Sequence, residues 1–571
     1  MLRSRAWRWV LLTCVLLAGV LVAQSCTGGP ARPAADLVLR GGVVFLADSA
    51  ATRTTALAVS GNQISAVGSD EDISGWIGPD TRVVELEGRL VTPGMNDAHL
   101  HLGPGGLSFL RVQLQGVTSL DEIEQRVRTA AHDAAPGEWI RGRGWDQTRL
   151  PAGELGPDGW PPMKVLDRAA PDNPVVLRRV DGHTAWMNSR AIQILGFDAE
   201  TPDPPGGSFV RDPATGELTG ILIEAAFDTV DARVGPPSAA SRKRGIELAL
   251  EMAARTGVTS VQSQAVDEDM AIYAELRAAG MLTVRVYGWL PLTHENIERY
   301  ARAGVEQASG DAWLRRGLLK GYSDGTLGSR TAWMLEPFSD DASTSGVARY
   351  TPEELRSLVS AADSAGLQVM VHAIGDRANR VVLDIYAQVA AADNRPRRHR
   401  IEHAQVLHPD DIPRFAQIGV VASMQPTHAT SDMRWAEERI GHERAERGAY
   451  AWRSLLDAGA VLAFGTDFAV EPMPPIEGLF SAVTRQSREE PDSPPGGWLP
   501  GQRLTIEEAI RAYSAGSAYA EFQDSIKGTL EPGMLADLVV WDRNLLTTPP
   551  EELLLASPDI TVVDGKFVFE R

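Results

Sequence analysis

A histidine pair with one residue between its members, His99-Leu100-His101, is the pattern in this sequence best suited to chemistry. It follows a β-rich run, Thr81 to Val91, and a Pro-Gly turn. Residues i and i+2 of a strand point to the same face, so both imidazoles would project side by side, as two ligands of one metal ion must. Such pairs also arise by chance. The interpretation therefore depends on whether later segments supply further ligands.

Four more side chains suited to metal chemistry stand at the ends of apolar, strand-like runs. These are Lys320, His372, His403 and Asp467. Neutral imidazole and carboxylate are natural protein ligands of Zn²⁺ and similar ions. The only two cysteines of the chain stand at its N-terminal end, so neither cysteine ligation nor a disulfide framework is expected in the folded domain.

The elements that would position these residues alternate between strand-like runs and amphipathic helical segments, from about Thr92 to Ser525. This alternation is typical of a parallel α/β fold, and eight such strands predict a (β/α)8 TIM barrel. The carboxyl ends of barrel strands open onto one mouth, where active sites lie. Besides the strand at His99, the expected strands are Val258–Gln262, Thr283–Tyr287, Leu318–Lys320, Gln368–His372, Arg400–His403, Val420–Gln425 and Val461–Asp467.

Two further parts are expected beside the barrel, which we assign to residues 93–525. Residues from about 103 to 240 are too many for one barrel helix and include stretches rich in Pro and Gly, so we expect an inserted subdomain over the barrel mouth. Residues 36–92 and 526–571 contain short strands and turns, and the first segment has no room for a core of its own. We expect the two ends of the chain to join into one small β-sandwich.

Size and charge limit the class of protein. A chain of 571 residues is too long for a single compact core, and 43% hydrophobic with 23% charged residues is typical of a globular protein. The formal net charge of −20 is spread along the chain, and only short basic pieces such as residues 395–398 occur after residue 30. Nucleic-acid binding is therefore not expected.

The first 25 residues predict a signal peptide that is not part of the fold. A basic start precedes an apolar run, Trp9 to Val22, that is short for a membrane span. The following Val22-Ala23-Gln24-Ser25-Cys26 resembles a bacterial lipobox, which implies a lipid on Cys26 and anchoring of the chain in the cell envelope. A secretory signal cut nearby, with a secreted or periplasmic product, is the alternative. Residues 26–35 would form a tether.

The motifs of the expected barrel resemble those of the amidohydrolase superfamily, and within it the YtcJ-like branch (amidohydrolase family 3), which includes N-substituted formamide deformylase. The resemblance covers nearly all of the chain after the signal. Its carriers are Thr92 to His101, Lys320 to Ala332, His372 to Ala378, Ile401 to His403, Gly465 to Asp467 and Gly533 to Leu538.

The resemblance implies a centre that binds one or two divalent ions, with Zn²⁺ as the first candidate. His99 and His101 would bind the more buried ion, and His372 and His403 the more exposed one. Asp467 would contact the buried ion and serve as general base for its water.

Lys320 stands where many members of the superfamily carry a lysine carboxylated by CO₂, and the resulting carbamate bridges two ions. A free ammonium group has no lone pair to offer a metal. The alternative is an ordinary charged lysine beside a site for a single ion, and the sequence does not distinguish the two.

Four residues outside the ligand set are candidates for substrate binding. His183 and Trp145 lie in the insert, where the alternatives are a structural loop histidine and ordinary packing. Asp324 and Arg330 follow Lys320 on the fourth barrel loop, where a loop-stabilising ion pair is the alternative. Among histidines without a motif, His428, after the seventh strand, is the one closest to the expected site.

The leading functional interpretation is a hydrolase that uses this metal centre on a small molecule with a non-peptide C–N bond, in an amide, an N-substituted formamide or a cyclic amide. A second interpretation is that the same metal centre hydrolyses a lactone or a phosphoester. A third, of another class, is a lipid-anchored binding protein whose metal site is vestigial. A homodimer is the one assembly that we consider, and the sequence does not decide it.

Overall fold

The computed structural model describes residues 34–157, 159–179, 184–204, 207–489 and 494–571. The predicted signal peptide, Cys26 with most of the tether, and His183 lie outside the described residues. Within the described ranges, no helix is both long enough and apolar enough to cross a membrane.

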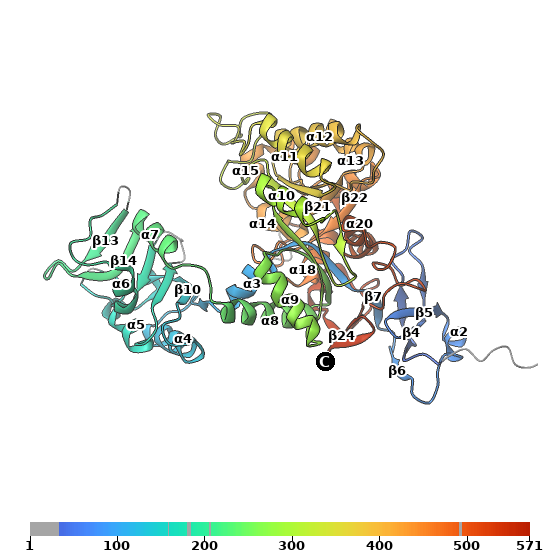
Figure 1. Cartoon of the computed structure of the whole chain (residues 1–571), viewed down its shortest axis with the longest axis horizontal. Helices are drawn as coiled ribbons and strands as arrows, with labels where there is room; N and C mark the ends of the chain where they lie inside the picture. Colours follow the sequence, from blue (N-terminus) through green and yellow to red (C-terminus); the bar gives the residue numbers. More distant parts are fainter. Residues whose placement is uncertain (1–33, 158, 180–183, 205–206, 490–493) are drawn as a thin grey trace, which may run out of the picture.

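Eight parallel strands form the centre of the molecule and confirm the predicted barrel (Figure 1). Backbone contacts close the ring between the first and last strands, because Asp467 N donates to His99 O at 2.7 Å and His101 N donates to Phe468 O at 2.6 Å. In ring order the strands are β8 (Met95–Leu100), β15 (Val258–Gln264), β16 (Arg285–Pro291), β18 (Leu314–Tyr322), β19 (Gln368–Ala373), β20 (Arg400–His403), β21 (Val421–Met424) and β22 (Val461–Phe464). The short β17 (Ser309–Gly310) pairs with β18 outside the ring.

The barrel strands are buried on both faces, which explains why they appear in the sequence as nearly continuous apolar runs. Every residue of β8 and of β19 is buried. Inside the ring, Tyr287, Trp289, Leu318 and Met370 pack against one another. Outside it lie the helices α8 (Ala239–Arg255), α9 (Asp267–Ala278), α10 (His294–Arg302), α11 (Pro352–Ser364), α12 (Asp376–Ala390), α13 (Ile412–Ile418), α14 (Pro426–Asp432), α15 (Ala436–Ile440), α16 (His442–Gly448), α17 (Trp452–Asp457), α18 (Pro475–Thr484), α19 (Ile506–Arg511) and α20 (Ser517–Ala520).

Both ends of the chain build the predicted β-sandwich. One sheet has the order β5-β4-β1-β6 and the other β25-β24-β23-β7-β2-β3, so the C-terminal strand β23 pairs with the N-terminal strand β7. The strands are β1 (Leu37–Arg40), β2 (Val43–Phe45), β3 (Arg53–Thr54), β4 (Ala56–Ser60), β5 (Gln63–Gly68), β6 (Arg82–Glu85), β7 (Leu90–Pro93), β23 (Leu538–Trp541), β24 (Pro558–Val563) and β25 (Lys566–Glu570), with the helix α2 (Asp70–Ser74).

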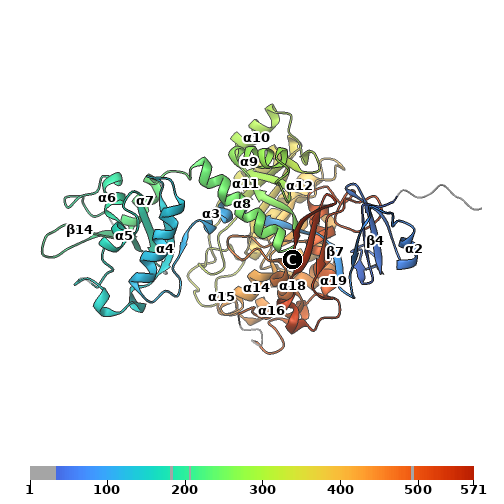
Figure 2. The ribbon, with the colours of Figure 1, turned by 90° about the horizontal axis from the view of Figure 1, so that it is seen from below.

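The insert forms a separate unit on the other side of the barrel from the sandwich (Figures 1 and 2). It leaves the barrel through α3 (Leu102–Phe109), directly after β8, and returns through α8, which leads into β15. Its predicted place over the barrel mouth stays a prediction. Its sheet has the order β13-β14-β12-β11-β10-β9. The elements are β9 (Val112–Gln113), α4 (Leu120–Asp133), β10 (Ile140–Trp145), α5 (Lys164–Ala169), β11 (Val175–Arg179), β12 (Thr184–Met187), α6 (Ser189–Leu195), β13 (Gly207–Arg211), β14 (Leu218–Glu224) and α7 (Ala225–Arg233).

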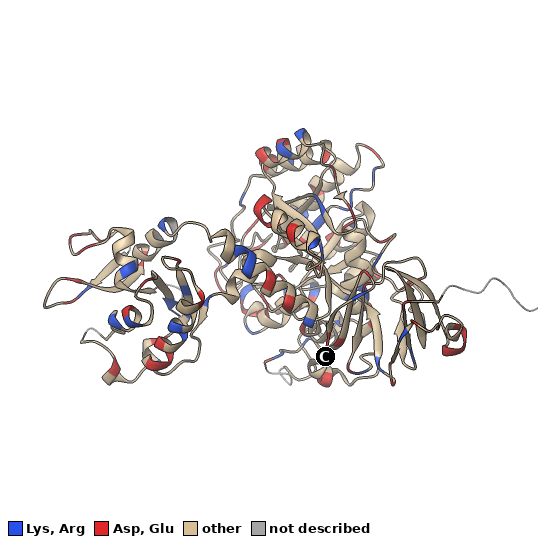
Figure 3. Cartoon of the chain, turned by 60° about the horizontal axis from the view of Figure 1, so that its bottom comes forward, with Lys and Arg blue, Asp and Glu red and all other residues tan. Residues whose placement is uncertain are grey.

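Charged residues of both signs are mixed over the barrel helices and the insert (Figure 3). The helix α2 at the edge of the sandwich begins with three acidic residues, Asp70, Glu71 and Asp72. This distribution agrees with the even spread of the net charge along the sequence.

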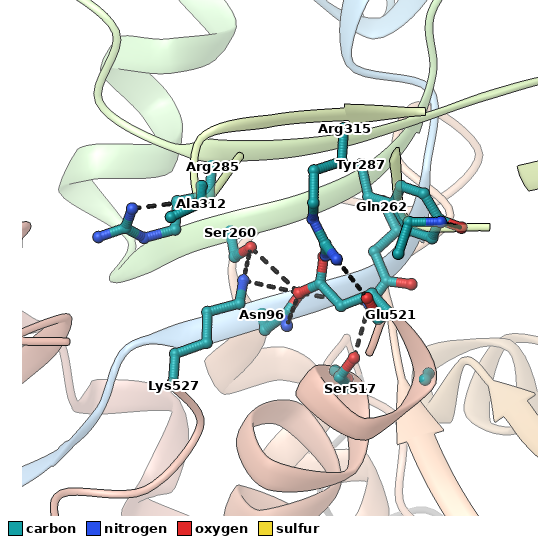
Figure 4. A network of polar contacts seen from close by, with 12 residues as sticks. Asn96, Ser260, Gln262, Arg285, Tyr287, Ala312, Arg315, Ser517, Glu521 and Lys527 are labelled. Atoms are coloured by element: carbon teal, nitrogen blue, oxygen red, sulfur yellow. Dashed lines mark hydrogen bonds and ion pairs between the residues drawn. The ribbon is translucent and has the colours of Figure 1, made fainter. Parts of the chain in front are cut away.

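A buried ionic network closes the amino-terminal end of the barrel (Figure 4). The Glu521 carboxylate accepts hydrogen bonds from Asn96 Nδ2 at 2.7 Å and Arg315 Nη2 at 2.6 Å, and Lys527 Nζ lies 2.6 Å from it. Burial lowers the pKa of Lys527 to about 8. Glu521 is thus the single carboxylate that two buried cations share within this network, and it ties the segment after α20 to β8 and β18.

Replacing Glu521 by Gln should destabilise the fold strongly, because it leaves Arg315 and Lys527 buried without their counter-charge. We expect a loss of about 3–5 kcal/mol in the free energy of unfolding, measured by chemical denaturation. The matched control is Glu298→Gln, which removes an exposed ion pair with Arg302 and should change stability by no more than ~0.5 kcal/mol. Equal stability of the two variants would contradict this account of the network.

Candidate metal centre

The barrel mouth brings the six predicted metal ligands together from five different strands or the loops after them. His99 lies near the end of β8 and His101 directly after it, whereas Asp467 follows β22 by three residues. The remaining three are Lys320 in β18, His372 in β19 and His403, the last residue of β20. Because parallel barrel strands all end at one mouth, residues far apart in the sequence meet here.

The first group of ligand atoms comes from His99, His101 and Asp467, and these atoms lie within 4.8 Å of one another. Asp467 Oδ1 is 3.6 Å from His99 Nε2 and 3.4 Å from His101 Nε2. Burial lowers the pKa of His99 well below its usual range, which keeps the imidazole neutral and able to ligate. The predicted first metal position therefore has a suitable set of donors.

A second group comprises His403, His428 and Asp467, again with ligand atoms within 4.8 Å of one another. His428 Nε2 lies 3.6 Å from Asp467 Oδ2, and the rings of His403 and His428 are stacked with centroids 5.7 Å apart. His428 was not among the predicted ligands. It is carried by the helix α14, so the pattern of strand ends could not identify it, and only its position after the seventh strand drew attention to it.

His372 lies beside the second group but outside it. Its ring centroid is 4.6 Å from that of His403, yet its Nε2 lies 2.9 Å from Gly325 O and 3.4 Å from Asp324 Oδ1. A carbonyl oxygen only accepts, so Nε2 carries the proton and Nδ1 is the nitrogen left for a metal. No atom of His372 belongs to either group of ligand atoms, and its role as a ligand stays a prediction.

Lys320 is buried among the ligands. Its Nζ lies 2.7 Å from His99 Nε2 and 5.5 Å and 5.2 Å from the ring centroids of Trp289 and Tyr322. Burial lowers the pKa of Lys320 to about 8, so part of the population carries the neutral amine, the form that adds CO₂. The surroundings suit a carbamate, whose formation stays a prediction.

The residues present fit a divalent metal ion. Asp467 Oδ1 and His428 Nε2 are buried and have no hydrogen-bond partner among the described residues. Burial would raise the pKa of Asp467, but the adjacent His101 and the electrostatic interactions with His403, His428 and Lys320 hold it well below its usual range. An ionised, buried carboxylate oxygen without a partner is costly, and a cation between these donors would satisfy it.

Each of four histidines at the centre turns its Nδ1 away from the ligand groups toward an outer side chain. Such partners fix ring orientation and tautomer. The Nδ1 atoms of three rings face oxygens: His101 faces Gln264 Oε1 at 3.2 Å, His403 faces Gln425 Oε1 at 2.8 Å and His99 faces Glu402 Oε2 at 3.5 Å. The Nδ1 atom of His428 faces the amide nitrogen Gln405 Nε2 at 3.4 Å. No sequence pattern marks the three glutamines, whereas Glu402 is adjacent to the predicted ligand His403.

Asp97 joins the first and last barrel strands directly below the ligands. Its Oδ1 accepts hydrogen bonds from Thr466 N at 3.0 Å and His99 N at 3.2 Å, and burial raises the pKa of Asp97 to about 7. A Cβ at Gly465 would lie 2.6 Å from His99 N, so only glycine permits this close approach. Together they set the position of Asp467, whose φ of 58° is unusual for a residue other than glycine.

The predicted substrate-binding residues are placed differently from the expectation. Trp145 is fully buried in the core of the insert and donates from Nε1 to Leu177 O at 2.8 Å, so it does not line the barrel mouth. Tryptophan is a large apolar side chain, and packing against Trp160 and Trp186 accounts for it.

Asp324 and Arg330 have partners within the barrel loops. Asp324 is buried and accepts from the backbone N–H groups of Trp333, Ile374 and Gly375 at 2.8–3.0 Å, so it organises the loops around His372. Arg330 forms two hydrogen bonds with Asp340, at 3.0 and 2.8 Å, the loop-stabilising ion pair that was the alternative interpretation.

Arg330→Ala should therefore leave kcat and KM for any hydrolysed substrate within about twofold of wild type, and it should cost less than ~1 kcal/mol of stability because the pair is partly exposed. Steady-state kinetics and a thermal melt check both values. A rise in KM without a change in kcat would instead indicate that Arg330 binds the substrate.

The chain matches the model of a family described as the amidohydrolase family over residues 82–569. It is 37% identical over 530 residues to the protein LONG AFTER FAR-RED 3 of Arabidopsis thaliana, covering 90% of this chain and 88% of that protein. It is 33% identical to YtcJ of Bacillus subtilis (94% and 99%) and 27% identical to N-substituted formamide deformylase of Arthrobacter pascens (94% and 98%). The crystal structure of an uncharacterized metal-dependent hydrolase from Pyrococcus furiosus matches with a TM-score of 0.73 and 30% identity, covering 90% of this chain and all of that one.

Proposed function

Because the chain belongs to the amidohydrolase family, we propose that it is a metal-dependent hydrolase that cleaves a non-peptide C–N bond in an amide, an N-substituted formamide or a cyclic amide. The predicted resemblance to this superfamily and to its YtcJ-like branch is confirmed by the family match and the relatives. The choice of a C–N bond is supported by the relative named for deformylation of N-substituted formamides, which aligns with 94% of this chain.

One observation carries the proposal. The Asp467 carboxylate is shared by both groups of ligand atoms, it is buried, and its Oδ1 has no partner among the described residues. His99 and His101 would hold one ion with Asp467, and His403 with His428 offers donors for a second. A bound Zn²⁺ or similar ion lowers the pKa of a water ligand to about 7 and polarises a carbonyl group.

Asp467 is the general base of the proposed reaction. Its ionised carboxylate accepts the proton of the attacking water and later delivers it to the leaving nitrogen, so no separate acid is needed. The rings of His99 and His101, held from outside by Glu402 and Gln264, orient the centre and keep this carboxylate in place. The chain thus contributes geometry and electrostatics in a site largely shielded from water.

A carbamate on Lys320 is part of the proposal. Reaction of the neutral amine with CO₂ converts the lysine, whose ammonium form cannot ligate, into a carboxylate-like ligand beside His99 Nε2. Incubation with ¹³C-labelled bicarbonate should give a carbamate signal in the ¹³C spectrum of the zinc-loaded protein. The signal should vanish in Lys320→Arg. A wild-type spectrum without it would leave Lys320 an ordinary lysine.

The proposed bond type is tested by a panel of N-formyl amines, small amides, cyclic amides, lactones and phosphoesters offered to the zinc-loaded protein. We expect at least one of the amides, cyclic amides or N-formyl amines to be hydrolysed, with a kcat/KM higher than that of any lactone or phosphoester. If only lactones or phosphoesters are hydrolysed, the assignment of the metal centre remains and the proposed bond type is overturned.

A further inference from the structure

A continuous chain of buried polar side chains runs through the barrel, from the network at its amino-terminal end to His99. Asn96 Nδ2 donates to Glu521 at 2.7 Å, and Gln262 Nε2 donates to Asn96 Oδ1 at 3.4 Å. Arg400 then bridges Gln262 Oε1 and, through Nε at 2.8 Å, Glu402 Oε1. Figure 4 shows the first part of this chain, around Asn96, Gln262 and Glu521.

Glu402 is the last member of the chain, and its carboxylate lies between Arg400, Ser423 and His99. Oε1 accepts from Arg400 Nε, and Oε2 accepts from Ser423 Oγ at 2.8 Å. Oε2 also lies 3.5 Å from His99 Nδ1, a nitrogen that has no hydrogen-bond partner among the described residues. Glu402, Arg400 and His99 are each 0% exposed, so water does not replace this contact.

The two nitrogens of His99 face different surroundings. Nδ1 faces Glu402, whereas Nε2 faces Lys320 Nζ and Asp467 Oδ1. Glu402 Oε2 is an acceptor, since Ser423 Oγ donates to it, so the His99 nitrogen that faces it carries the ring proton. In a neutral imidazole this leaves the lone pair on Nε2, the nitrogen at the metal position. The ring also stacks on Trp289 at 5.9 Å, which limits its rotation.

We propose that Glu402 is a positioning residue of the metal centre: it holds His99 in the Nδ1-protonated form with Nε2 toward the metal, and Arg400 in turn holds Glu402. The inference rests on the proposed function for the presence of a metal ion at this position. Outer partners of metal-binding histidines typically contribute 10–100-fold to metal affinity.

The test measures metal affinity, which needs no substrate. Zinc dissociation constants are determined by competition with a chromophoric chelator for wild type, Glu402→Gln and Glu402→Ala, and cobalt-loaded samples give the absorption spectrum of the centre. Gln retains an oxygen that accepts from Nδ1–H, so we expect about a tenfold loss of affinity for Glu402→Gln and about a hundredfold loss for Glu402→Ala, with a changed cobalt spectrum.

The matched control is Asp537→Asn, which breaks another buried ion pair, at the amino-terminal end of the barrel. Asp537 accepts from Arg285 Nε at 2.7 Å and Nη2 at 2.9 Å, with no link to His99 through the chain described above. The control should melt at a lower temperature yet bind zinc with wild-type affinity and show the wild-type cobalt spectrum. This separates positioning of His99 from a general loss of stability.

Two results would overturn the inference. One is a Glu402→Ala protein that is folded, by circular dichroism, and binds zinc within twofold of wild type. The other is an equal loss of affinity in Asp537→Asn. In either case hydrolysis by the wild type would leave the proposed function intact. A wild-type protein that binds no metal would overturn both the inference and the proposed function. If Glu402→Ala binds zinc more weakly but the wild type hydrolyses no amide, the inference is supported and only the proposed bond type is overturned.

Discussion

Asp467→Asn should lower kcat for amide hydrolysis by about 10²–10⁴-fold, the range that a general base contributes, while most of the zinc stays bound. The amide keeps the shape of the side chain and one oxygen for the metal, but it cannot accept the proton of the attacking water. His99 and His101 remain as ligands. The measurement is kcat together with the zinc content of the same sample.

The control for this prediction is Asp340→Asn, a carboxylate on a loop at the same mouth that pairs with Arg330 and Arg439. It should turn over at nearly the wild-type rate. Near-normal turnover in Asp467→Asn would refute the assignment of the base. Loss of all zinc from that variant would show instead that Asp467 acts mainly as a ligand.

His99→Ala should remove the metal itself and, with it, both the activity and the stability that the metal contributes. Metal that binds only the folded state adds about 2.7 kcal/mol when its free concentration is a hundred times the dissociation constant. Wild type treated with a chelator should therefore melt at a lower temperature, and added zinc should restore the melting temperature and the hydrolysis. The variant should melt at one temperature with or without zinc.

His132→Ala is the matched control, because that side chain is exposed on α4, in the insert. It should retain the zinc content and the zinc-dependent melting shift of wild type. A His99→Ala protein that binds zinc as tightly as wild type would contradict the first group of ligands.

The fold was predictable because the barrel strands are buried on both faces and most contain an apolar run, so their positions in the sequence are visible without the structure. All eight expected strands overlap with observed ones. Arg400–His403 coincides with β20, whereas the ends of other strands differ. The fourth was expected over Leu318–Lys320, whereas β18 covers Leu314–Tyr322. Its first half contains Arg315, a charged residue that the pattern excludes from a core and that is buried because Glu521 and its neighbours satisfy it.

The site was predictable where it depends on strand ends and not where it depends on loops or helices. His99, His101 and Asp467 meet because barrel topology brings strand ends together. His428 joins them from the short helix α14, and Gln264, Gln405 and Gln425 act only through geometry, which residue type does not reveal. Trp145 was proposed for the substrate site but lies in the core of the insert. A large aromatic residue is more often buried by packing than exposed to a ligand.

Zinc titration of the metal-free wild-type protein tests most directly whether the chain is a metal-dependent hydrolase. Bound zinc and hydrolysis of an N-substituted formamide or related amide are followed in the same samples. We expect hydrolysis to be absent without metal and to rise in proportion to bound zinc, until binding saturates at one or two ions per chain. Less than one bound ion per chain at saturation, with no hydrolysis of any substrate in the panel, would contradict it.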